Sequence, residues 1–245
     1  MFAGRPIIGL VGGIGAGKSH VARLFEAAGC CRIASDEMVR AAYTHPAVKR
    51  AVVERFGEQV LGEAGGIDRR RIADIVFRNI QERKWLEALL HPVANQARLE
   101  VMERAARDPA IVAFIWDSPL LLEAGLEELC DAVVFVDAPL ADRLRRVSDR
   151  GWDAAELERR ENVQMPLDKK RGKADYHLVN ADANPAKAGA VAAMLKEILN
   201  RFAAACAGSC GGACGPTCAC GCPPSRMPLP DAEGDPPSMA DNVDS

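Results

Sequence analysis

The sequence predicts an α/β fold of three layers, in which helices cover both faces of a five-stranded parallel sheet. Three observations lead to this expectation: apolar runs with strand character alternate with helical segments, a glycine-rich loop separates the first strand from the first helix, and two later strands end near aspartates. The runs with strand character are residues 7–11, 31–34, 110–116, 132–136 and 177–179. Such alternation is typical of a doubly wound sheet.

The helical segments fall into three groups. Residues 18–28 have helical spacing and end at Gly29, a favoured C-terminal cap. Residues 46–107 are helical for longer than a simple crossover requires, so we expect a helical substrate-binding insertion there. Arginine-rich helices over about 139–150 and 153–163 predict a helical lid within residues 139–170, and Asn184-Pro185 predicts the start of a last helix.

Residues 205–245 differ in composition from residues 1–204, which we expect to form the folded domain. The segment contains six Cys, seven Pro and six Gly and no aromatic residue, so it is expected to be disordered. Its cysteine spacing differs from the C-x₂-C pairs of structural zinc sites, although six thiols are able to bind soft metals. A passive extension is the expectation, and a metal-binding or redox-sensing role is the alternative.

Charge and hydropathy exclude several classes of function. The chain of 245 residues is 49% hydrophobic and 27% charged, which suits a globular protein with a sizeable core. Residues 1–202 hold 30 basic and 29 acidic residues, without the basic excess of a nucleic-acid binder. No apolar stretch is long enough to cross a membrane, and the N-terminus does not have the apolar segment of a signal peptide. We therefore expect a cytoplasmic protein that is monomeric or weakly homo-oligomeric.

The phosphate loop, residues 12–19, carries the most specific motif. Its sequence GGIGAGKS satisfies G-x-x-x-x-G-K-[ST], between a strand and a helix as the motif requires. The glycines let backbone N–H groups turn inward around phosphate oxygens, and the helix N-terminus adds positive charge. Lys18 is expected to bridge the β and γ phosphates and Ser19 to hold Mg²⁺. The expected ATP contacts here are Gly13, Ile14, Gly15, Ala16, Gly17, Lys18, Ser19 and His20.

Two carboxylates follow predicted strands, at the edge where parallel sheets bind ligands. Asp36 could accept or orient the proton of an attacking hydroxyl, or it could cap a helix beginning near Glu37. Asp117 could support Mg²⁺ through water, or it could be only a turn former. Arg143, Arg146 and Arg150 share one helix face, which suits either a solvated surface or a lid over a nucleotide.

Taken together, these residues resemble the dephospho-CoA kinase family from about Ile7 to Leu199. The resemblance rests on the order of several motifs: the phosphate loop, Asp36, Phe56-Gly57, Asp68-Arg69, Val76-Phe77, Leu89-Leu90-His91-Pro92, the segment from Asp117 to Glu123, Arg146, Arg150, Arg160, Gln164, Ala174-Asp175 and Asn180. Three positions depart from the family pattern, namely Ala34, His20 and the run Ala181-Asp182-Ala183 in place of a glycine.

The resemblance implies a reaction in which the γ-phosphoryl group of MgATP passes to the ribose 3′-hydroxyl of dephospho-CoA, giving CoA and ADP. Asp36, Lys18 and Arg146 would be catalytic, and Asn180 would lie beside ATP. The acceptor would contact Asp36, Arg69, His91, Pro119 and Leu120, unless His91 only breaks a helix before Pro92.

Other classes of protein share the phosphate loop. Another small-molecule kinase, acting on a nucleoside, nucleotide or shikimate-like alcohol, is the nearest alternative, and the long helical insertion argues against it. A guanine-nucleotide switch would need an Asn-Lys-x-Asp run, and the sequence contains none.

Overall fold

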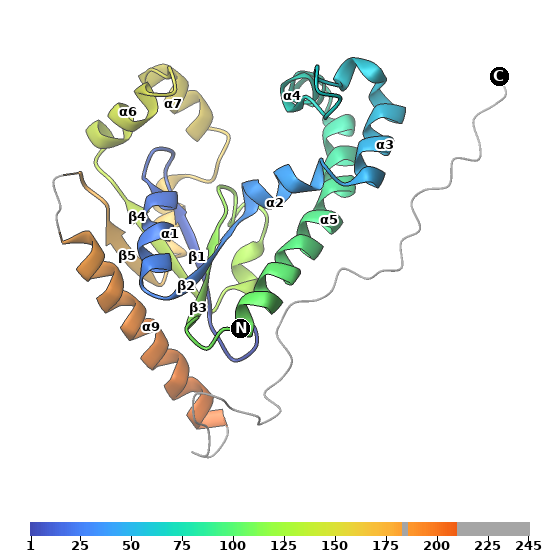
Figure 1. The fold of residues 1–245 in the computed structure, drawn as a ribbon. Coiled ribbons are helices and arrows are strands. Elements are labelled where there is room, and N and C mark those ends of the chain that lie inside the picture. Colours follow the sequence, from blue (N-terminus) through green and yellow to red (C-terminus); the bar gives the residue numbers. More distant parts are fainter. Residues whose placement is uncertain (183–185, 210–245) are drawn as a thin grey trace.

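The computed structural model describes residues 1–182 and 186–209, and its centre is a parallel sheet (Figure 1). The sheet has five strands in the order β2-β3-β1-β4-β5. Their bounds are β1 Ile7–Gly12, β2 Cys30–Ala34, β3 Ala113–Asp117, β4 Ala132–Asp137 and β5 Tyr176–Val179. Gly9 of the central strand is in register with Trp116 on one side and with Val133 on the other.

Helices cover both faces of this sheet, which confirms the predicted three-layer α/β class. On one face, α1 (Lys18–Ala27) and α9 (Lys187–Ser209) pack against the strands. Phe25 of α1 and Val191 of α9 are fully buried there. On the other face, the C-terminal part of α5 (Ile80–Ala106) and the segment after β3 form the second core, which includes Met102, Phe114, Trp116, Leu121 and Phe135.

The helical insertion has a hydrophobic core of its own. It consists of α2 (Ser35–Ala42), α3 (Pro46–Phe56), the short η1 (Glu58–Val60), α4 (Arg69–Arg78) and the N-terminal part of α5. Val52, Ile72 and Leu90 are buried between these helices. In Figure 1 the insertion projects from the sheet at the upper right, on the side away from α6 and α7.

The helix α5 is unbroken through Pro92, so the expectation that His91 ends a helix before this proline is wrong. Leu90 and Ala94 are buried on either side of Pro92, and their packing holds the helix together despite the lost backbone donor. Asn79 caps the first turn by accepting hydrogen bonds from the backbone of Gln81 and Glu82.

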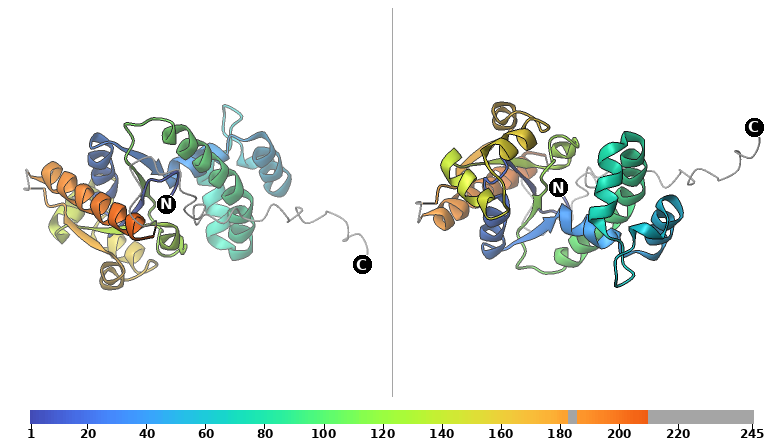
Figure 2. Two further views of the ribbon diagram at one scale, coloured as in Figure 1. Left: turned by 90° about the horizontal axis from the view of Figure 1, so that it is seen from below. Right: turned by 90° about the horizontal axis from the view of Figure 1, so that it is seen from above.

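The region expected to form the lid, called the lid region below, contains α6 (Leu140–Ser148), α7 (Ala154–Glu161) and α8 (Leu167–Gly172). Figure 2 shows this region and the insertion on opposite sides of the sheet. The helix α8 was not expected, because six residues are too short to establish a periodicity. The short η2 (Leu126–Leu129) precedes β4.

The strand expected over residues 110–116 begins later, at Ala113. The backbone before it is turned aside, because Ala110 donates to Asp108 Oδ1 and the Ile111 carbonyl accepts a 2.6 Å bond from Arg5 Nε. The helix start expected at Asn184-Pro185, and most of the cysteine-rich tail, lie outside the described residues; residues 205–209 continue α9. Within the described ranges, no helix is both long and apolar enough to span a membrane.

Candidate active site

The phosphate loop connects the C-terminal end of β1 to the first turn of α1. Gly15 and Gly17 have φ values of 75° and 84°, a conformation that side chains disfavour. Lys18 Nζ lies across the loop and donates to the carbonyls of Gly12 and Gly13, each at 3.1 Å. The phosphate loop therefore forms as expected, and hydrogen bonds to two of its carbonyls hold Lys18 across it.

Burial and, after it, the charge of Lys170 lower the pKa of Lys18 to about 8, although the charges of nearby carboxylates act in the opposite direction. Lys18 is therefore mostly protonated at neutral pH. Ser19 and His20 follow on the first turn of α1, where both are exposed. A hydroxyl at this position is accessible to a metal ion beside the loop.

Asn180 and Arg146 brace the loop from its outer side. Asn180 Nδ2 donates to the Ala16 carbonyl at 2.7 Å, and Arg146 donates to the carbonyls of Gly15 and Ala16, each at 3.0 Å. Arg146 Nη2 also donates to the Asn180 carbonyl at 2.7 Å. The structure thus places Arg146 against the loop's backbone oxygens, a bracing contact that the motif does not reveal.

Asp182, which belongs to the run that departs from the family pattern, contacts Arg145 and Arg146 of α6. Its carboxylate accepts from Arg146 Nη2 at 2.7 Å and forms an ion pair with Arg145, while its backbone N–H donates to Asp142. Asp182, two residues after Asn180, is therefore tied to α6 and holds Arg146 beside the phosphate loop.

Asp36 lies in the first turn of α2, and the interpretation of this residue as an N-cap is wrong. Ala34 occupies the N-cap position, and no side chain caps the helix. Although Asp36 is exposed, partial loss of hydration raises the pKa of its carboxyl, and the charge of Asp117 adds to this effect. The charges of Arg40, Lys18 and Arg69 act in the opposite direction and lower this pKa.

Asp117 ends β3 in register with Ala34 of β2 and is 7% exposed. Arg32 Nη1 lies 3.5 Å from the Asp117 carboxylate, and Nη2 of the same arginine pairs with Glu37 on α2. The side chains of Asp117 and Ser19 carry oxygen atoms of the kind that Mg²⁺ prefers as ligands. Among the described residues, no group of three or more His, Cys, Asp or Glu side chains is placed to hold a metal ion.

The expected acceptor contacts are only partly brought together. Buried Leu121 and Leu122 anchor the segment after β3, so Pro119 and Leu120 remain on the outside. His91 is exposed on α5, and no described contact joins it to Asp36.

The lid contains charged residues that motif comparison did not single out. Lys170 of α8 is 2% exposed and lies 2.9 Å from both Glu123 Oε1 and Gln164 Oε1. Glu161 of α7 pairs with Arg143 Nη1 at 2.6 Å. The sequence around Lys170 offered no signal for this burial, because its charged partner, Glu123, comes from a distant segment.

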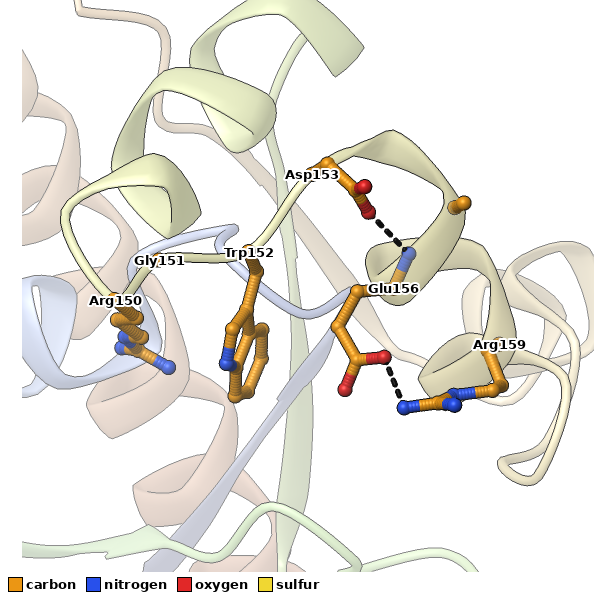
Figure 3. Close-up of a pocket in the computed structure, with 7 residues that line it drawn as sticks. Arg150, Gly151, Trp152, Asp153, Glu156 and Arg159 are labelled. Atoms are coloured by element: carbon orange, nitrogen blue, oxygen red, sulfur yellow. Dashed lines mark hydrogen bonds and ion pairs between the residues drawn. The ribbon is translucent and has the colours of Figure 1, made fainter.

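Arg150 and Arg160, both expected in the lid, flank the indole of Trp152 at 5.7 and 4.1 Å from its centroid. An open pocket of about 620 Å³ adjoins this indole (Figure 3). Glu156, which lines the pocket, pairs with Arg160 at 2.6 Å and also with Arg159. These arginines are thus held by residues of the lid itself.

The fold and the site together define a nucleotide-binding α/β protein of the phosphate-loop class. A family model described as "Dephospho-CoA kinase" matches residues 6–185. The chain belongs to the dephospho-CoA kinase family.

Individual relatives agree with this assignment. The chain is 39% identical over 194 residues to a dephospho-CoA kinase of Anaeromyxobacter dehalogenans, covering 78% of this chain and 92% of the relative. It is 38% identical over 176 residues to that of Parasynechococcus marenigrum, covering 71% and 87%. A crystal structure of TT1252 from Thermus thermophilus is 33% identical with a TM-score of 0.66, covering 80% of this chain and 97% of that one.

Proposed function

We propose that the protein transfers the γ-phosphoryl group of ATP to the ribose 3′-hydroxyl of dephospho-CoA, the last step of coenzyme A biosynthesis. One observation supports this most directly: Asp36 lies in the first turn of α2, directly after β2, and Ala34 of β2 is in register with Asp117 at the end of β3, the neighbour of β1. The expected donor and acceptor sites would therefore share the edge of the sheet at which β1 leads into the phosphate loop.

On the donor side, the phosphate loop binds the triphosphate through its inward N–H groups, and Lys18 contacts the β and γ phosphates. Mg²⁺, held by Ser19 and through water by Asp117, would neutralise charge on the phosphate oxygens. Arg146 and Asn180 keep the loop in shape through their bonds to Gly15 and Ala16. Arg146 contributes positive charge close to the loop as well.

On the acceptor side, Asp36 accepts or orients the proton of the 3′-hydroxyl. Its raised pKa makes the carboxylate a stronger base than an ordinary aspartate. Arg69 lies at the start of α4 and supplies a cation near the acceptor's diphosphate. Pro119 and Leu120, exposed beside β3, and His91 would form further contacts with the acceptor.

The test is ADP release measured separately with dephospho-CoA, adenosine and shikimate as acceptors. Turnover with dephospho-CoA alone, with the new phosphate located on the 3′-oxygen by ³¹P NMR, is the expected result. Equal turnover with shikimate or adenosine would instead assign the protein to a different small-molecule kinase activity.

A further inference from the structure

A lid carboxylate contacts the phosphate loop directly. Glu161, the last residue of α7, accepts a 3.1 Å hydrogen bond at Oε1 from the backbone N–H of Ile14. Figure 1 shows α6 and α7 above the end of the sheet where the loop lies. The contact joins residues 147 positions apart, so it depends on the placement of the lid.

The surroundings of this carboxylate are those of an anion site. The same Oε1 atom lies 2.6 Å from Arg143 Nη1, and its charge raises the pKa of Lys18. A Cβ added to Gly13 would lie 3.0 Å from Oε1, so the carboxylate lies close against the loop backbone. A backbone N–H, a guanidinium and the loop lysine are the groups that bind phosphate oxygens in such loops.

We propose that Glu161 occupies the place of a terminal phosphate oxygen before ATP binds, and that it must leave for the triphosphate to enter fully. This inference rests on the proposed function, because it takes the phosphate loop as the ATP site. Glu161 then acts as an internal competitor of ATP, and its departure releases Arg143 to contact the phosphates. Binding of ATP is thereby coupled to movement of α7.

Removal of the competing charge strengthens ATP binding. We expect Glu161→Gln to lower the Kd for ATP about tenfold, the scale of one charge-assisted hydrogen bond. Adenosine lacks phosphates, so its Kd stays within about twofold. Calorimetric titration of each variant with ATP and with adenosine measures both values.

Two further variants separate occupancy of the site from general charge. Glu158→Gln removes the same charge from an exposed position on α7 and should leave the Kd for ATP within about twofold. Glu161→Asp keeps the charge but shortens the side chain, so it should also tighten ATP binding. If Glu161→Gln were insufficiently folded for titration, Glu161→Asp would decide the matter.

Two outcomes overturn the inference. One is an unchanged or weaker affinity for ATP in the Glu161 variants, and the other is equal tightening by Glu158→Gln. Wild-type turnover with dephospho-CoA is measured in parallel. If turnover is normal, either outcome rejects only the proposed role of Glu161. Absence of turnover with dephospho-CoA would instead reject the proposed function.

Discussion

Asn180 Nδ2 lies so close to Gly17 that a Cβ on this glycine would approach it to 2.3 Å. The same Nδ2 donates to the Ala16 carbonyl, which makes Asn180 a fixed wall behind the loop. The glycine at this position is therefore required both by its φ of 84° and by the close approach of a buried side chain.

Gly17→Ala should consequently displace the loop and lower kcat/KM for ATP by roughly 10² or more, as expected for a misplaced reactant. Steady-state kinetics measure the effect, with circular dichroism to verify folding. Gly125→Ala is the matched control, because its φ is 66° but nothing lies within 4 Å of the added Cβ. Comparable losses in the two variants would contradict the prediction, because Gly125 lies outside the phosphate loop and its added Cβ meets no neighbour.

The lowered pKa of Lys18 predicts a distinctive pH dependence. As the pH rises through about 8, Lys18 loses its charge, and the affinity for ATP should fall by up to about tenfold per pH unit. The unfolded chain, with a lysine pKa near 10.5, binds more protons over this range, so this residue's contribution to folding stability instead increases between pH 8 and 10.5.

Titrations of ATP binding between pH 7 and 10 measure the first of these effects. In Lys18→Met, affinity should be weak and this step near pH 8 should be missing. A wild-type affinity that stays constant up to pH 10 would contradict the assigned pKa. The groups whose charges act on Lys18 are Lys170, Asp117, Glu123 and Glu161, so all four must be intact in the comparison.

Asp36→Asn should lower kcat by roughly 10² or more while ATP binding remains intact, because it removes the group that handles the proton. The wild-type enzyme should lose activity at low pH, with a midpoint above 3.8, since the pKa of Asp36 is raised. Rapid-quench kinetics and the pH profile measure these effects. Glu54→Gln, at an exposed position on α3, is the control; near-normal turnover in Asp36→Asn would exclude the role in catalysis.

Arg98 is a buried cation with little compensation. It is 9% exposed, its guanidinium lies 4.3 Å from the centroid of Trp116, and its Nε has no hydrogen-bond partner among the described residues. Burial lowers its pKa to about 10, well below the usual arginine value, a cost of roughly 3 kcal/mol at about 1.4 kcal/mol per pH unit. The cation–π contact returns about 2 kcal/mol.

Arg98→Met should therefore raise the free energy of unfolding by about 1 kcal/mol, because an apolar side chain suits this position better. Urea denaturation measures the change. Arg23→Met, at an exposed position on α1, should change stability by less than about 0.5 kcal/mol. A clear loss of stability in Arg98→Met would indicate that the guanidinium has a partner of greater value than the indole.

The order of strands and helices was predictable because it depends on local patterns. The glycine loop, the apolar runs and the helical spacing are each visible within a few residues, and the structure confirms the sheet that they imply. The start of β3 was not predictable, because Arg5, more than 100 residues earlier in the chain, binds the backbone just before this strand. Continuity of α5 through Pro92 likewise depends on packing by other helices.

The candidate site likewise contains some residues that local patterns predict and others that they do not. Lys18 and Ser19 follow from the motif, but the contacts of Arg146 with loop carbonyls do not, because helix periodicity does not specify a distant partner. The role of Glu161 could not be predicted from its own segment, because this role depends on contacts with Ile14 and Arg143 elsewhere in the chain. The oligomeric state and the role of the cysteine-rich tail stay predictions.

The helix α5 also limits how this enzyme could be rebuilt. Leu86 and Leu90 belong to the core of the insertion, whereas Met102 of the same helix belongs to the core of the sheet. The helical insertion is therefore not a unit that can be exchanged by itself. A chimaera that grafts it onto another phosphate-loop kinase would have to carry the whole of α5 and the sheet surface that receives it.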